Sequence, residues 1–262
     1  MSLPAETAGP PGTSRRDRHR QATTAEIVRA GRSLLSEPGG LSLRAVAHQM
    51  GMTAPALYRY VDDYQGLVRL LTRDIESETA DRLRAARDSQ PEDDPAAQII
   101  CAAVEFRRWA LTRRDEFALV FANPQTTIDE PALAMQEHQT GHVFTELLVR
   151  LWMKYDFPLP RLEDLDPLVV EALDDPMVPA KVDELPTSAR TLVWVFMQSW
   201  AQLYGTVTLE VFGHCDPRII ASAAMFRSML VNQSELLGIS HEVQRLQPHI
   251  DQWLADDTDS SR

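Results

Sequence analysis

Long apolar runs and paired cysteines are both missing from the sequence. No apolar run approaches the roughly 18 residues that a membrane span needs. The N-terminus is polar, with Pro, Gly, Ser and Arg, and lacks the apolar core of a secretory signal. Cys101 and Cys215 lie far apart and form no CxxC pair, which gives metal or redox chemistry little support. We therefore expect a cytoplasmic protein with no membrane partner, no metal and no cofactor.

Basic residues are outnumbered over the whole chain but not at its start. The 262 residues hold 26 Lys and Arg against 38 Asp and Glu, a formal net charge of −12. Residues 1–75 contain ten Arg and seven acidic residues, a net of +3, so the remainder carries −15. A basic N-terminal segment followed by an acidic remainder is typical of a DNA-binding protein with a separate regulatory domain, although solvated acidic faces are also common.

Apolar residues follow helical spacing from Thr23 onward, without the alternation that marks strands. A Thr-x-x-Glu capping box at Thr23 and Glu26 opens the first helix, and the stretch EPGG (37–40) ends it. Residues 1–20 are polar and read as a disordered basic arm. The pattern predicts an all-α fold that begins with a small helical domain over residues 21–75.

Two short helices joined by a tight turn follow the first helix. Ser42 caps the earlier one, Gly51 supplies the turn, and Thr53 caps the later one. Asp62 or Asp63 can cap the next helix, which accounts for acidic residues at this point. This arrangement suits a three-helix helix-turn-helix unit, whose second helix lies in the DNA major groove. From spacing alone, a helical hairpin that serves only packing is an equally good interpretation.

Small residues, then aromatic and basic ones, make up the later of these two helices. Ala56 is small enough for close approach to a base and could touch a thymine methyl group. Tyr58, Arg59 and Tyr60 could reach phosphates, which position a protein on DNA without reading its sequence.

Residues 23–75 resemble the N-terminal domain of the TetR (tetracycline repressor) family of bacterial regulators. The stretch TTAEIVRAGRSLLSEPGGLSLRAVAHQMGMTAPALYRYVDDYQGLVRLL matches that family's opening helix, its G-x-SLRAVA-xxx-G segment and its recognition helix. The resemblance implies that Thr53, Ala54 and Ala56 face base edges. It also implies phosphate contacts from Ser42, Arg44, Tyr58 and Tyr60.

Two positions depart from the family's pattern. Val61 stands where Phe is usual, which only reduces the side-chain volume in the core. Tyr64 stands where a lysine normally contacts phosphate, and it keeps a hydrogen-bond donor but not the charge. A cluster of arginines before the first helix could compensate by reaching the minor groove or the backbone, or it could be a solubilising tail. These arginines are Arg15, Arg16, Arg18 and Arg20.

Residues 76–255 are expected to form a larger helical domain for effector binding and dimerisation, followed by a tail (256–262). The expected helices span about 96–113, 114–122, 131–154, 168–173, 188–212, 217–237 and 241–255. Within it, RRDEFALVFANP (113–124) and WAQLYGTVTLEVFGH (200–214) resemble a TetR-family C-terminal domain named for a Trp-His-Gly signature, with Tyr204 in place of the usual His. This resemblance implies a homodimer made by the last two long helices, whereas an ordinary monomer core is the alternative.

A pocket between helices is the default site for a small effector. Its expected wall consists of aromatic and imidazole side chains, namely Phe106, Trp109, Phe121, His138, His142, Phe144, Trp152, Phe196 and Trp200. The two histidines share one helical face, but a third metal ligand is missing and HQTGH is not the HExxH zinc motif.

Together these features predict a ligand-responsive DNA-binding transcriptional regulator. We expect a repressor that binds a palindromic operator as a dimer and is released by an unknown small-molecule effector. One alternative is a sensor or interaction protein of the same fold whose DNA binding has weakened, since Tyr64 replaces the lysine. A helical enzyme is the other, but no nucleophile–base set or paired carboxylates stand out, so no enzyme activity is expected.

Overall fold

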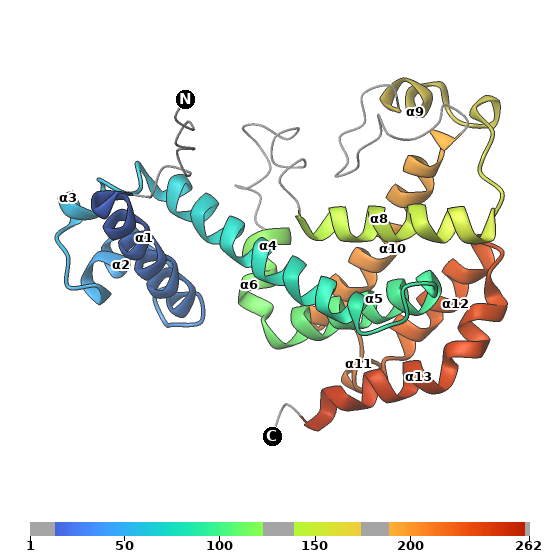
Figure 1. Ribbon diagram of the computed structural model, residues 1–262. Helices are drawn as coiled ribbons and strands as arrows, with labels where there is room; N and C mark the ends of the chain where they lie inside the picture. Colours follow the sequence, from blue (N-terminus) through green and yellow to red (C-terminus); the bar gives the residue numbers. More distant parts are fainter. Residues whose placement is uncertain (1–13, 123–138, 174–188, 260–262) are drawn as a thin grey trace, which may run out of the picture. The chain divides into compact units, whose positions relative to one another are not determined.

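The computed structural model describes residues 14–122, 139–173 and 189–259 (Figure 1). Every regular element among these residues is a helix, which confirms the predicted all-α fold. The chain divides into an N-terminal unit (Met1–Leu71) and a C-terminal unit (Thr72–Arg262). The division falls within helix α4 (Tyr64–Asp88), which contributes residues to both units. No helix in the described part of the chain is long and apolar enough to cross a membrane.

The N-terminal unit is built from α1 (Arg15–Leu34), α2 (Leu43–Gln49), α3 (Ala54–Leu57) and the first turns of α4, and the first three lie together in Figure 1. Each helix gives large side chains to one small core. Those with no more than 1% of their surface exposed are Ile27, Val46, Leu57, Leu67, Val68 and Leu71. Gly31 on α1 allows a close approach, because a Cβ there would lie 2.9 Å from the Leu71 methyl groups.

The expected disordered arm over residues 1–20 is wrong for residues 15–20, because α1 begins at Arg15 rather than at Thr23. Ser14 and Asp17 form a complete capping box. The Asp17 N–H donates to Ser14 Oγ (3.2 Å), and the Ser14 N–H donates to Asp17 Oδ2 (3.3 Å). This pair satisfies two of the four N–H groups that a helix start leaves unpaired, which is sufficient reason for the earlier start.

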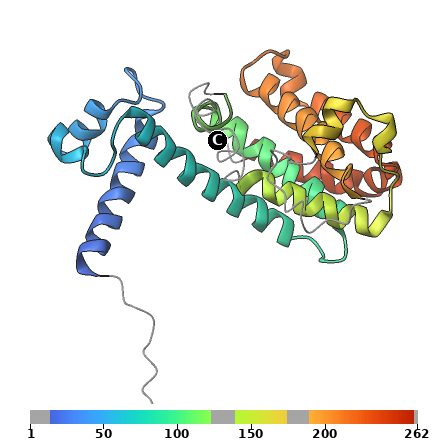
Figure 2. The ribbon, with the colours of Figure 1, turned by 90° about the horizontal axis from the view of Figure 1, so that it is seen from above.

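The C-terminal unit surrounds α5 (Pro95–Thr112), which is buried along most of its length. α5 packs against α8 (Gln139–Tyr155), α10 (Leu192–Val211) and α13 (Ser240–Asp259). Figure 2 shows α8 running alongside α5. The shorter elements are α6 (Arg114–Phe121), a 3₁₀ turn η2 (Leu162–Asp164), α9 (Pro167–Ala172), α11 (Pro217–Ala221) and α12 (Ala224–Leu236). The predicted tail is wrong for residues 256–259, because the backbone of α13 stays helical to Asp259.

The prediction of a single helix over residues 217–237 is also wrong, because the helix is interrupted between α11 and α12. Ala223 takes a left-handed conformation (φ 53°), which is rare for a residue with a Cβ. The break changes the hydrogen bonding of the Ile220 carbonyl, which accepts from the Ala223 N–H (3.0 Å) and from Arg107 Nη2 (2.7 Å). In an uninterrupted helix the Ala224 N–H would take that carbonyl. The arginine and the break therefore occur together.

Arg107 ties three parts of the C-terminal unit together from its place on α5. Its Nε donates to Glu210 Oε2 on α10 (2.6 Å), and its guanidinium lies 5.6 Å from the centre of the Phe226 ring on α12. Both partners of the ion pair are buried, and Glu210 has no exposed surface. Burial raises the pKa of Glu210, while the adjacent Arg107 charge opposes that rise. The positive charge of Arg107 therefore compensates the buried negative charge of Glu210.

We expect Arg107→Ala to lower the free energy of unfolding by about 3–5 kcal/mol, because it leaves a buried carboxylate without its partner. Arg84→Ala is the control, since Arg84 pairs with Asp81 on an exposed face of α4 and should lose no more than about 1 kcal/mol. Urea unfolding followed by circular dichroism measures both. Equal losses in the two variants would contradict the role given to Arg107.

Candidate functional site

Helices α2 and α3 are joined by a tight turn centred on Gly51. Gly51 has φ +64°, a conformation that glycine adopts without steric cost. The turn is closed by the Met52 N–H, which donates to the Ala47 carbonyl (2.8 Å). Thr53 then caps α3 in an extended conformation, as predicted, and its side chain makes no capping hydrogen bond. The two short helices and their turn have the form of a helix-turn-helix.

The residues expected at base edges lie at the start of α3. Thr53 and Ala54 are exposed, and Ala56 is half-buried. The side chains at this helix start are small, so another molecule can approach the backbone closely. The hydroxyl of Thr53 is not engaged in capping, which keeps it available to a base edge.

The residues expected at phosphates flank this helix start. Arg44, Tyr58 and Arg59 are exposed, with 51% of Tyr58 accessible. Ser42 has a structural role as well, because its Oγ accepts the Ala45 N–H (3.1 Å) and caps α2. Tyr64, the first residue of α4, is 37% exposed.

Tyr60 is half-buried, and Arg20 from α1 lies over its ring, with 5.9 Å between the guanidinium carbon and the ring centre. Arg20 was expected only in a flexible arm. The sequence did carry the signal that places it on a helix, because Ser14 and Asp17 have the spacing of a capping box.

Asp63 caps α4, as one of the two expected alternatives. Its Oδ1 accepts the Gly66 N–H (2.6 Å), and both Asp62 and Asp63 are exposed. A carboxylate at this position also interacts favourably with the positive end of the helix dipole. The acidic pair is therefore compatible with a surface that binds an anion, since one of its two charges is committed to the helix.

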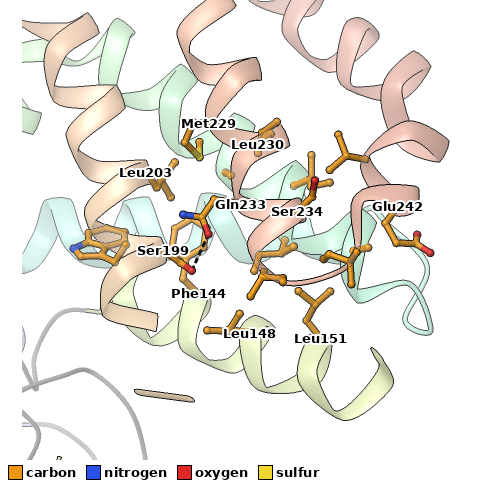
Figure 3. A pocket seen from close by; sticks show the side chains of 18 of the residues that line it. Phe144, Leu148, Leu151, Ser199, Leu203, Met229, Leu230, Gln233, Ser234 and Glu242 are labelled. Atoms are coloured by element: carbon orange, nitrogen blue, oxygen red, sulfur yellow. Dashed lines mark hydrogen bonds between the residues drawn. The ribbon is translucent and has the colours of Figure 1, made fainter. Parts of the chain in front are cut away.

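A separate apolar cavity lies within the C-terminal unit, between α5, α8, α10, α12 and α13. Its volume is about 100 Å³, which is several times the space that one water molecule occupies. Figure 3 shows Phe144, Leu148 and Leu151 from α8 on one side and Met229 and Leu230 from α12 on the other. The walls are almost entirely carbon.

Three of the nine side chains expected around an effector line this cavity, namely Phe144, Phe196 and Trp200. Phe106 and Trp109 are buried in an aromatic cluster with Phe117 and Phe121, in which ring centres lie 5.2–6.2 Å apart. His142 and Trp152 are half-buried on α8 outside the cavity lining, and His138 lies outside the described residues. Within the described part of the chain, no three His, Cys, Asp or Glu side chains gather as metal ligands.

Comparison with known proteins finds the family model described as "Tetracyclin repressor-like, C-terminal domain", which matches residues 99–232 and so just over half of the chain. The chain belongs to the TetR family. It is a TetR-family transcriptional regulator, and its all-helical fold agrees with that membership.

Similar proteins include the HTH-type transcriptional regulators Rv1816 of Mycobacterium tuberculosis and Mb1846 of Mycobacterium bovis. Each is 29% identical over 218 residues, which is 78% of this chain and 89% of the relative. Among solved structures, SCO4313, described as a candidate regulatory protein, has a TM-score of 0.61 and 26% identity, over 84% of this chain and 98% of that one. A Rhodococcus protein of unknown function shares the fold (TM-score 0.51, 21% identity, 80% and 94% coverage).

Within this TetR-family chain, the replacement of the signature histidine by Tyr204 has a visible structural effect. The Tyr204 hydroxyl on α10 donates to the Phe121 carbonyl at the last residue of α6 (2.8 Å). A helix end leaves its last carbonyls unpaired, and this bond satisfies one of them. The tyrosine therefore fastens α6 to α10.

We expect Asp63→Ala to lower the free energy of unfolding by about 0.5–2 kcal/mol, because it removes the cap of α4. Asp62→Ala removes the same charge from the neighbouring exposed position and should change stability by less than about 0.5 kcal/mol. Thermal unfolding of the two variants side by side measures the difference. If both variants melt alike, Asp63 is not the cap.

Proposed function

We propose that this regulator binds double-stranded DNA by placing the start of α3 in the major groove. The observation that supports this most directly is the tight Gly51 turn, which presents the small exposed residues Thr53 and Ala54 at a helix start. Ala56 is the third candidate for a base contact. The arrangement favours direct readout at close range, because no bulky side chain holds the backbone away from the bases.

Phosphate contacts surround this helix start. We assign them to Ser42, Arg44, Tyr58, Arg59, Tyr60 and Tyr64. Arg16 and Arg20 extend the set, because residues four apart share one face of a helix and Arg20 lies against Tyr60. Arg16 is one turn further toward the N-terminus on the same face of α1, so it extends the basic surface beyond Tyr60.

Arg16→Ala and Arg20→Ala should each weaken DNA binding and reduce the slope of log K against log salt by about one, because each removes one phosphate contact. Fluorescence anisotropy with a bound genomic fragment, repeated over a series of salt concentrations, measures the slope. Arg84→Ala removes a basic residue of the C-terminal unit and should leave the slope unchanged. A slope that is insensitive to the α1 arginines would exclude them from the DNA contact.

We further propose that α10 and α12 form a homodimer interface. These helices pack against each other, and each also exposes apolar side chains. On α12 the exposed residues Met225, Ser228, Asn232 and Leu236 recur at helical spacing, and on α10 the exposed face includes Met197, Ala201, Leu209 and Phe212 at its end. Exposed faces on which apolar side chains such as Met225 and Leu236 recur, mixed with the small polar residues Ser228 and Asn232, favour burial against a second copy.

Met225→Glu should convert the dimer to a monomer, because it places a charge in the proposed apolar seam. Met153→Glu is the matched control, since Met153 on α8 is 74% exposed and lies outside these exposed faces of α10 and α12. Sedimentation velocity or light scattering gives the mass of each variant. A Met225→Glu protein that remains a dimer would place the interface elsewhere.

The response to an effector is assigned to the cavity of the C-terminal unit. Helix α8 lines the cavity, and its first turn is held by α4, since the Thr140 N–H and hydroxyl both donate to Glu76 Oε2 (3.2 and 2.9 Å). A ligand that moves α8 therefore acts on α4, the helix that also contributes to the N-terminal unit. Release of the operator follows if the ligand prefers the state that binds DNA less well.

Salt-sensitive binding to a palindromic fragment, lost on addition of effector, tests the repressor function as a whole. Failure to shift any genomic fragment at low salt would contradict it and favour a second candidate, a sensor of the same fold with weakened DNA binding. Tyr64, which lacks the positive charge of lysine at the start of α4, supports that candidate. Tyr64→Lys distinguishes the two, because a gain of affinity shows an intact docking surface, whereas no binding by either protein favours the sensor.

A further inference from the structure

The cavity of the C-terminal unit has a distinct chemical character beyond its apolar walls. Of the described residues that line it, Glu242 is the only one with a charged side chain, and no Lys or Arg is among them. Figure 3 shows Glu242 at one edge of the labelled side chains. A ligand with a carboxylate or phosphate group would find no cation in this lining, and burying such a charge without a partner is costly.

Glu242 is already engaged by groups outside the cavity. Arg245 Nη2 lies 2.6 Å from its Oε2, and His241 Nε2 lies 3.2 Å from its Oε1. Tyr155 also hydrogen-bonds to this carboxylate, and burial together with the Glu242 charge raises the pKa of Tyr155 to about 12. Arg245 in turn bonds Asp94 (2.8 Å). Glu242 is therefore compensated within the protein, and the cavity gives no strong preference to a cationic ligand either.

The polar group that distinguishes the cavity is the amide of Gln233. Ser199 Oγ on α10 donates to Gln233 Oε1 on α12 (3.0 Å), as the dashed line in Figure 3 marks. The other end of the amide, Nε2, is buried and has no hydrogen-bond partner among the residues that the structure describes. A buried donor without a partner carries a desolvation cost, which a ligand oxygen can remove. Because Nε2 is covered by neighbouring atoms, the terminal amide must turn to meet that oxygen.

We infer that the effector is an uncharged, mainly apolar molecule whose single hydroxyl or carbonyl oxygen pairs with the Gln233 amide. The apolar walls supply the binding free energy, and the amide selects an oxygen-bearing ligand over a pure hydrocarbon. This inference rests on the proposed effector response, but it concerns ligand chemistry alone and can be measured without DNA.

Two probes of equal chain length, 1-hexanol and hexanoate, separate an uncharged ligand from an anionic one. Titration of the full chain at neutral pH, followed by tryptophan fluorescence, reports binding because Trp200 lines the cavity. We expect 1-hexanol to bind at least about tenfold more tightly than hexanoate, because the carboxylate would be buried without a partner. Equal or tighter binding of hexanoate, or no binding of either probe, would overturn the inference.

Gln233→Met tests the amide, since methionine keeps the length of the side chain and removes its polar end. We expect it to weaken 1-hexanol binding about three- to tenfold, the range for one neutral hydrogen bond. Gln244→Met on the exposed side of α13 is the matched control and should have no effect. An unchanged affinity in Gln233→Met would overturn the role of the amide. If that variant does not fold, Gln233→Leu replaces it, and the same weakening of 1-hexanol binding, about three- to tenfold, is expected.

DNA binding of the same preparations is measured separately. If 1-hexanol binds as expected but DNA is not released, the ligand chemistry stands and the proposed effector response fails. If neither probe binds while the operator is still bound, the ligand chemistry fails and the DNA-binding proposal stands.

Discussion

The buried guanidinium of Arg107 is the interaction on which the C-terminal unit depends. A buried positive charge is tolerated inside an apolar core only when it has polar or charged partners. Here the guanidinium contacts the Glu210 carboxylate, the Ile220 carbonyl and the Phe226 ring. The first partner fixes α10 against α5, and the second requires a carbonyl at a helix break. The path of the backbone through α11 and α12 is therefore matched to the Arg107 side chain. The same match sets the position of the exposed residues on α12.

The hydrogen bond between Ser199 and Gln233 joins α10 to α12, whereas the ion pair between Arg107 and Glu210 joins α5 to α10. Among the described residues each contact leaves one buried polar atom without a hydrogen-bond partner, Glu210 Oε1 in the ion pair and Gln233 Nε2 in the other, but only Gln233 lines the apolar cavity. The two contacts therefore hold different parts of α10. Its C-terminal half is held by a strong buried contact, and its middle meets α12 through a weaker one. A small molecule in the cavity therefore meets α10 at the weaker of these two contacts.

Much of the N-terminal unit could be predicted from the sequence because its signals are local. Caps at Ser42, Thr53 and Asp63 and the turn at Gly51 each depend on a few neighbouring residues. The C-terminal unit resisted prediction where distant residues decide the outcome. The break at Ala223 occurs together with a bond from Arg107, which lies 113 positions before Ile220 in the sequence. Aromatic residues expected around an effector became core for the same reason, since periodicity marks a side chain as buried but not as part of a cavity wall.

The capping box of Ser14 and Asp17 has a consequence for the thermodynamics of recognition. A flexible arm that becomes ordered on a partner must give up about 1–2 kcal/mol of backbone conformational entropy per residue at that moment. Here the ordering of Arg16 and Arg20 takes place during folding, before any partner is present. Arg16 and Arg20 therefore contribute to association as preorganised side chains. Without the Ser14 cap, the entropy cost of ordering this segment would arise on binding instead of during folding.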